Sequence, residues 1–271
     1  MTYAVIAAAT LSVLPLLVLR GRTLVYCFAT ELSLTAIVSF CWWHFSPGVE
    51  PRLAAVTFCA LLLLVLMLFI ARGTEVLWGA GRAATIALIV YGLCVPAMLR
   101  TAIDGDEPYY LLLTDSLLRD HDLDLRNQYR DRALAVTGRA DLQAMPGDPT
   151  GPHGEQYSRH EPFLPALMLP GYAVAGLPGA LATIVLFGGL LVRSTIRMLE
   201  DEGVGDGTAR TVFAFIAFGP PLLFYAARIW PEVPAAWCFV EAIRGMRQRR
   251  SRRWIAALLA LVLLKLRFVL V

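Results

Sequence analysis

The sequence predicts an all-α polytopic membrane protein with about eight transmembrane helices and an outer loop that contains a juxtamembrane helix. Of its 271 residues, 58% are hydrophobic and only 17% are charged, and the mean hydropathy is +0.62. A soluble domain would have about a quarter of its residues charged. Several apolar runs reach about 18–20 residues, the length that a helix needs to cross the hydrocarbon of a bilayer.

The expected spans follow one another along the chain, with short basic or turn-rich segments between them. They cover residues 2–19, 23–44, 53–71, 84–101, 179–198, 209–231, 233–243 and 254–271. The prolines of "FGPP" (218–221) predict a break or kink within the run 209–231.

The orientation follows from the arginines. The segment "RGMRQRRSRR" (244–253) holds six arginines between two spans, so the positive-inside rule places it in the cytoplasm. A nucleic-acid patch could have the same composition, but its position between spans favours a topology signal, and we expect no nucleic acid partner. We therefore expect a multi-pass protein of the plasma (inner) membrane, whose spans contact membrane lipids. The alternation of the spans then places the loop 102–161 on the outer side of that membrane.

The outer loop 102–161 concentrates the polar chemistry of the chain. It contains 12 of the 21 carboxylates, and Asp104, Asp106 and Glu107 come directly after the fourth span. Pro108 and the leucines that follow predict an amphipathic helix over 107–120 at the membrane surface. A helix cap or a solvated surface is the alternative explanation for any one of these acids.

Two further segments stand out. The proline-rich stretch 161–179 cannot be a full crossing without breaking the alternation, so it predicts a juxtamembrane or re-entrant element on the outer side. Glu232, in "RIWPEVPAA", lies between two apolar stretches. A carboxylate within a membrane is costly and indicates a functional site, although a helix start after Pro231 would also explain it.

Residues 84–271 resemble the GT-C superfamily of integral-membrane glycosyltransferases, in the branch of the protein O-mannosyltransferases and the aminoarabinose transferase of lipid A. The resemblance lies in the outer Asp106-Glu107 pair, in "YSRHEPFLP" (157–165) and in "FYAARIWPEVPAA" (224–236). The resemblance implies that residues 84–271 form an incomplete GT-C-like membrane core, which includes the outer loop 102–161, and that residues 1–83 are an accessory segment of three spans. The chain departs from the family in these additional spans and in having Glu232 where Asp is common. It also stops inside an apolar run, where such enzymes continue, so we expect a fragment or one half of a split enzyme.

The resemblance implies transfer of a sugar from a polyprenyl-phosphate carrier to an acceptor glycan, lipid or protein on the outer face. Asp106 is expected to be the base that takes the proton of the acceptor hydroxyl. Glu107 and Asp104 would orient or bind the substrate. Glu232 would position the acceptor or a metal.

The donor phosphate needs cations. Lys265 and Arg267, in "LLKLRFVLV", are expected to meet it, although snorkelling at a helix end would also explain them. Arg228 and Arg159 are weaker candidates, and His160 could orient the loop or the substrate. No cofactor is certain; a divalent metal is possible, and "DHDLDL" (120–125) resembles a DxD metal motif by its letters alone.

Two other functions stay open at this point. A transporter or flippase would be expected to have internal repeats and charges near the midplane of the membrane, and the sequence shows no convincing repeat. A non-catalytic assembly subunit is the second alternative. A serine hydrolase is disfavoured because the sequence has no GxSxG motif.

Overall fold

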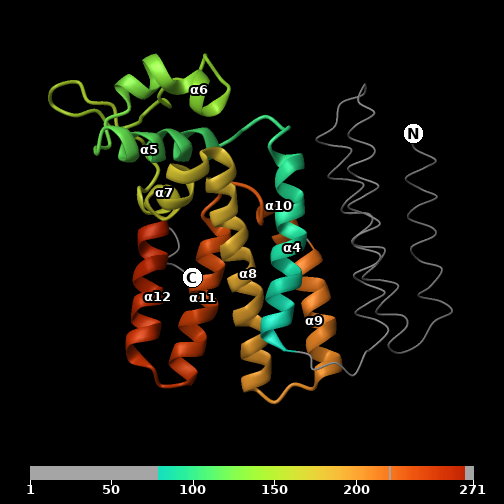
Figure 1. Cartoon of the computed structure of the whole chain (residues 1–271). Coiled ribbons are helices and arrows are strands. Elements are labelled where there is room, and N and C mark those ends of the chain that lie inside the picture. The colour runs from blue at the N-terminus through green and yellow to red at the C-terminus, as the bar shows by residue number, and fades with distance from the viewer. Residues whose placement is uncertain (1–78, 220, 266–271) are drawn as a thin grey trace, which may run out of the picture.

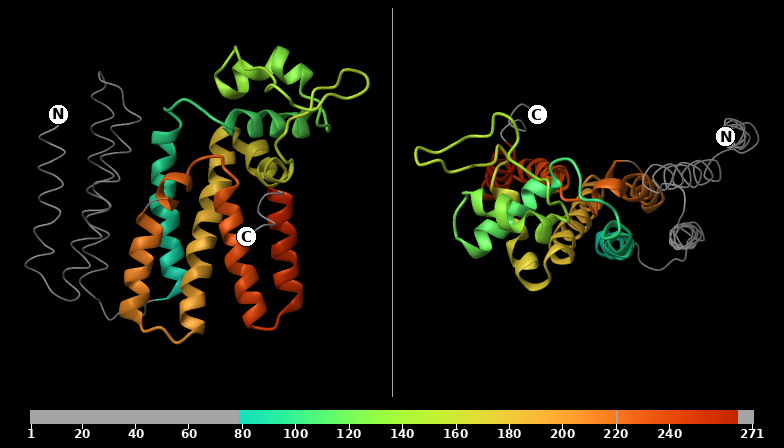
Figure 2. Two further views of the ribbon diagram at one scale, coloured as in Figure 1. Left: turned by 180° about the vertical axis from the view of Figure 1, so that it is seen from behind. Right: turned by 90° about the horizontal axis from the view of Figure 1, so that it is seen from above.

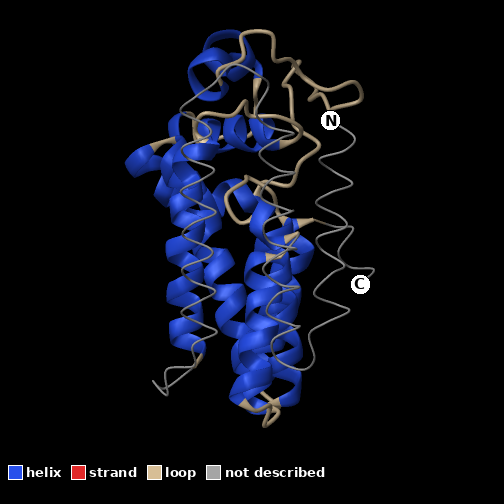
Figure 3. Cartoon of the chain, turned by 90° about the vertical axis from the view of Figure 1, so that its right-hand side faces the viewer, coloured by secondary structure: helices blue, strands red, loops and turns tan. Residues whose placement is uncertain are grey.

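The computed structural model describes residues 79–219 and 221–265, and within these ranges it is built from helices with no strand (Figures 1 and 3). In chain order the helices are α4 (Ala80–Met98), α5 (Glu107–Arg119), the π-helix η1 (Gln128–Arg132), α6 (Ala133–Thr137), α7 (Phe163–Ala175), α8 (Leu177–Asp201), α9 (Asp206–Phe218), α10 (Leu222–Tyr225), α11 (Glu232–Arg247) and α12 (Ser251–Leu264). The all-α prediction is therefore confirmed for this part of the chain.

The helices form a bundle with a cap at one end. Figures 1 and 2 show α4, α8, α9, α11 and α12 running side by side, while α5, α6 and α7 gather across one end. We call residues 102–175 the cap. The turn 248–250 between α11 and α12 lies at the opposite end of the bundle (Figure 1).

Helix α8 is the centre of the bundle, because it packs against α4, α7, α9 and α11. Glycines on α8 allow these close approaches. A Cβ atom at Gly179 would overlap the backbone of Gly171 on α7, and one at Gly188 would come within 3.0 Å of the ring of Tyr91 on α4. Small residues at helix contacts are typical of packing between helices in membranes.

Two of the described helices, α4 with 19 residues and α8 with 25, are long and apolar enough to cross a membrane. They coincide with the predicted spans 84–101 and 179–198. Helices α9, α11 and α12 have 13, 16 and 14 residues, which is less than the roughly 20 residues that a straight crossing needs. The described residues therefore contain fewer full-length spans than predicted, and the predicted spans 2–19, 23–44 and 53–71 lie outside them.

The predicted interruptions are present. Helix α9 ends at Phe218, at the start of "FGPP", and the chain continues through the short α10 before α11 begins at Glu232. The stretch 161–179 forms the short helix α7 and the first turn of α8. Pro108 lies in the first turn of α5, as expected.

The surroundings of α5 differ from the prediction. All ten residues from Glu107 to Ser116 are buried, whereas an amphipathic helix on a membrane surface would bury one face. Helix α5 contacts α7 on one side, and η1 and α6 on another. The residues after α5 fold back over it, so the helix forms the interior of the cap.

Candidate functional site

The acidic pair at the start of α5 divides into one exposed and one buried carboxylate. Asp106 is the N-cap residue of α5 and Glu107 is its first residue. The side chain of Asp106 is 29% exposed, and that of Glu107 is 4% exposed. Neighbours in sequence thus face different environments, and only Asp106 is open to a ligand from solution.

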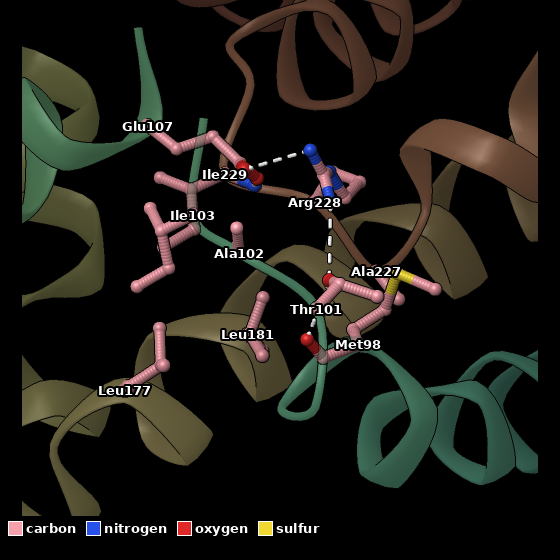
Figure 4. Close-up of a pocket in the computed structure, with 10 residues that line it drawn as sticks. All are labelled: Met98, Thr101, Ala102, Ile103, Glu107, Leu177, Leu181, Ala227, Arg228 and Ile229. Atoms are coloured by element: carbon pink, nitrogen blue, oxygen red, sulfur yellow. Dashed lines mark hydrogen bonds and ion pairs between the residues drawn. The ribbon is translucent and has the colours of Figure 1, made fainter. Parts of the chain in front are cut away.

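Glu107 is held by groups from a distant part of the chain. Its Oε2 lies 3.0 Å from Nη2 of Arg228, and its Oε1 accepts a hydrogen bond of 2.7 Å from the backbone N–H of Ile229 (Figure 4). Nη1 of Arg228 also lies 3.4 Å from the hydroxyl of Thr101, just after α4. These contacts join the start of α5 to the segment that leads into α11.

The space beside the Glu107–Arg228 pair is small. Met98, Ile103, Leu177 and Leu181 help to line a cavity of about 20 Å³ there, which is room for one water molecule. Burial raises the pKa of Glu107 above its ordinary value, against the opposing effects of Arg228 and of the backbone N–H of Ile229. A sugar does not fit this cavity, so Glu107 is placed to fix the backbone.

Asp106 lies between two groups from other elements. Its Oδ1 is 3.9 Å from Nε2 of His160, in the segment before α7. Its Oδ2 is 3.9 Å from Nζ of Lys265, at the C-terminal end of α12. The sequence predicted all three as site residues, and the structure brings them together at the capped end of the bundle.

His160 is fixed by aromatic contacts. Its ring centroid lies 4.9 Å from that of Tyr110 and 5.7 Å from that of Tyr109, and its side chain is buried. Burial lowers the pKa of His160, Asp106 opposes that effect, and Lys265 adds to it. The imidazole is therefore neutral at physiological pH. The sequence did not predict the two tyrosines as site residues, although they follow Pro108 directly.

Other predicted residues have contacts elsewhere. Nε of Arg159 lies 2.7 Å from Asp148, within the irregular part of the cap. Asp104 is exposed, and its Oδ1 accepts a 2.7 Å hydrogen bond from the N–H of Gly105 in the turn before α5. Neither residue contacts Asp106 through an ion pair or hydrogen bond in the described part of the chain.

Glu232 is the first residue of α11, in the position that a helix start after Pro231 requires. Its Oε2 atom is buried. The indole of Trp230, two residues earlier, lies against Gly105: a Cβ there would be 3.2 Å from the ring. The start of α11 therefore approaches the start of α5. Arg267 lies outside the described residues.

Asp115 is a buried carboxylate that the sequence analysis did not single out. Its side chain is inaccessible to solvent, and it lies 3.0 Å from Nε of Arg119 and 3.1 Å from Nε of Arg132. The hydroxyl of Tyr172 on α7 donates a 3.2 Å hydrogen bond to it. Asp115 thus ties α5 to η1 and α7. The spacing of Asp115 and Arg119 by four residues on a helix was the signal available in the sequence.

The carboxylates of "DHDLDL" stabilise the loop that contains them. Asp120 accepts a 2.9 Å hydrogen bond from Asn127, Asp122 accepts one of 3.0 Å from Ser116, and Asp124 accepts one of 2.8 Å from Arg126. Across residues 79–219 and 221–265, no three His, Cys, Asp or Glu side chains are placed to hold a metal ion. The chemistry proposed below uses no metal.

Comparison of the chain with protein-family models, with curated proteins and with solved structures finds no match.

Proposed function

We propose that the chain is a multi-pass plasma-membrane glycosyltransferase whose cap faces outside, and that it moves a sugar from a polyprenyl-phosphate carrier to an acceptor glycan, lipid or protein. The observation that carries the proposal is the arrangement around Asp106. An accessible carboxylate begins a helix at one end of an apolar bundle, with a lysine and a neutral histidine 3.9 Å away. This combination supplies a base and a cation where a lipid-linked donor would meet a water-soluble acceptor.

In the proposed reaction, Asp106 takes the proton of the acceptor hydroxyl as that oxygen forms a bond with the anomeric carbon of the sugar. The bond from the anomeric carbon to the carrier phosphate breaks, and its electron pair leaves with the polyprenyl phosphate. The ammonium group of Lys265 offsets the negative charge that develops on the phosphate. Attack from the face opposite the leaving phosphate inverts the anomeric carbon.

The neighbouring groups position this base. Glu107 fixes the first turn of α5 through Arg228 and Ile229, and the ring of His160 lies between the tyrosines and Asp106. In this proposal Glu107 and His160 are positioning residues. Arg159 supports the loop through Asp148.

The test is a transfer assay in membranes that contain the protein expressed from its native reading frame. Radiolabelled polyprenyl-phosphate sugars are supplied, and label in endogenous acceptors is measured for wild type, Asp106→Asn and the matched control Asp141→Asn. Asp141 is an exposed acid of the cap that pairs with Arg139. We expect transfer by wild type and by the control, and loss with Asp106→Asn. Equal transfer by all three would remove Asp106 as the base, and no transfer by wild type from any donor would favour a transporter or an assembly subunit.

A further inference from the structure

A second polar site lies at the end of the bundle opposite the cap. The ends of α8 and α11 and the start of α12 enclose a pocket of about 300 Å³, a volume within the range of small-molecule sites. Its walls contain five arginines, with one carboxylate and one amide. The arginines are Arg193, Arg197, Arg244, Arg250 and Arg253.

Two of these arginines are held rigidly by acids. Arg244 is buried and lies 3.2 Å from Glu241 and 3.0 Å from Asp201. Arg253 forms an ion pair with the same Glu241. The two carboxylates balance these two guanidinium groups, and they connect all three helices around the pocket.

The remaining arginines leave the pocket positively charged. Arg193 and Arg250 form no ion pair with any described residue, and Arg197 lies 3.9 Å from Glu200 on its own helix. A loop that served only as a topology signal would need positive charge but no defined arrangement of it. Here unpaired guanidinium groups from α8 and from the start of α12 face one preformed pocket, which is the geometry that binds phosphate oxygens.

The surface next to the pocket identifies the kind of phosphate. Leu186, Leu190, Arg193 and Arg197 are spaced four, three and four residues apart, so they lie on one face of α8. Leu186 is 50% exposed. The arginines thus continue an apolar stripe of the longest described apolar helix, as a phospholipid with its headgroup at the membrane boundary would require.

We propose that this pocket binds the phosphate of an anionic phospholipid headgroup, with the acyl chains along the Leu186 face of α8. Basic pockets between transmembrane helices on the cytoplasmic side bind anionic lipids in this way. The site needs only that the bundle lies in a membrane. Lipid binding and sugar transfer can therefore fail independently.

The test compares two double variants of the purified full chain. Arg193→Gln with Arg250→Gln removes the two unpaired pocket arginines. Arg249→Gln with Arg252→Gln removes the same charge from exposed positions near the turn between α11 and α12 that do not line the pocket. Binding of phosphatidylglycerol, of phosphatidylcholine and of inorganic phosphate is measured by native mass spectrometry and by the rise in melting temperature that a bound ligand causes.

We expect phosphatidylglycerol to bind wild type in preference to phosphatidylcholine. The pocket variant should weaken that binding at least about tenfold, and the loop variant less than about threefold. Equal losses in the two variants would show that bulk charge is responsible and would overturn the proposal. Binding of inorganic phosphate that depends on the pocket, without binding of phosphatidylglycerol, would overturn the lipid assignment. The pocket variant is folded if its melting temperature equals that of wild type when both are measured without added lipid.

Discussion

The guanidinium of Arg228 lies 3.0 Å from the buried carboxylate of Glu107, and this pair connects the segment before α11 to the first turn of α5. Asp106 is the N-cap residue of that turn. The position of Asp106 relative to Lys265 and His160 therefore depends on the ion pair between its neighbour Glu107 and Arg228. In the proposed mechanism, Glu107 has a structural role and Asp106 a chemical one.

Replacing Arg228 should cost more stability than replacing Glu107. Arg228→Gln leaves a buried carboxylate without its cation, so we expect the free energy of unfolding to fall by about 3 kcal/mol. Glu107→Gln keeps an oxygen that can accept the hydrogen bond from Ile229. The cation that it leaves unpaired is less buried than Glu107, because 16% of the Arg228 side chain is exposed against 4% for Glu107, so this variant should cost less, about 2 kcal/mol. Denaturation of the two single variants and of the double variant measures this. A cost of Glu107→Gln equal to or above that of Arg228→Gln would contradict the account.

The Glu107 carboxyl also gives a pH dependence. Its pKa is raised in the folded state, mainly by burial, so its contribution to stability is full below the pKa of the unfolded chain and is lost as the pH rises through the folded pKa. The destabilisation by Arg228→Gln should therefore shrink as the pH falls and Glu107 takes up its proton. Melting temperatures from pH 4 to pH 8 test this, and a cost of Arg228→Gln that grows toward acid pH would be the opposite result.

Gly105→Ala should be more harmful than a similar change elsewhere in the cap. Gly105 and Gly138 both have a positive φ, 62° and 73°, which costs about 1–2 kcal/mol for alanine. A Cβ at Gly105 would also lie 3.2 Å from the indole of Trp230, whereas nothing lies within 4 Å at Gly138. The excess loss of stability in Gly105→Ala over Gly138→Ala measures the packing of Trp230. Equal losses would show that this packing is loose.

Asp115→Asn should loosen the cap. Burial alone would raise the pKa of Asp115, but hydrogen bonds from Arg132 and Arg119 outweigh it and hold the pKa below its ordinary value. We expect the variant to lose about 2–3 kcal/mol of unfolding free energy at pH 7. The loss should disappear as the pH falls through the lowered pKa of Asp115. The exposed Asp131 pairs with Arg130, and Asp131→Asn should have no measurable effect; comparable destabilisation by both variants would be inconsistent with a buried hub.

His160 should make the stability of the cap fall at acid pH. Its pKa is lowered by burial; Asp106, Asp148 and Glu161 oppose that effect, and Lys265 adds to it. The stabilisation is full above about pH 6.5, the unfolded value, and is lost as the pH falls through the folded pKa. His160→Gln should make the melting temperature less dependent on pH below about pH 6.5 than it is in wild type. If the melting temperature of the variant falls at acid pH as much as that of wild type, another group is responsible for the loss of stability.

The local features of the fold were accessible from the sequence. The apolar runs predicted α4 and α8, the prolines predicted the end of α9 at Phe218, and Pro108 predicted the start of α5. Each of these depends on neighbouring residues only. The burial of α5 was not predictable in this way, because it depends on the packing of α7, η1 and α6 around the helix.

The sequence predicted which residues belong to the candidate site, but it did not predict which residues contact one another. Asp106, His160 and Lys265 were singled out separately, and the structure places them together. The pairing of Glu107 with Arg228 and the contacts of Asp115 with Arg132 and Tyr172 join residues that are far apart in the chain, which hydropathy and spacing do not encode. The acids of "DHDLDL" resemble a metal motif in sequence, but in the structure their carboxylates accept hydrogen bonds from nearby residues of the same loop.

The most direct test of the central claim is the sugar-transfer rate at saturating donor for Asp106→Asn and Glu107→Gln, measured beside their melting temperatures. If Asp106 is the base, Asp106→Asn lowers kcat by about 100-fold or more and leaves the melting temperature near that of wild type. Glu107→Gln should then lower kcat by less than about tenfold, because its side chain does not reach the acceptor. A full kcat in a folded Asp106→Asn protein would contradict the account, as would a greater loss in a Glu107→Gln protein of unchanged stability.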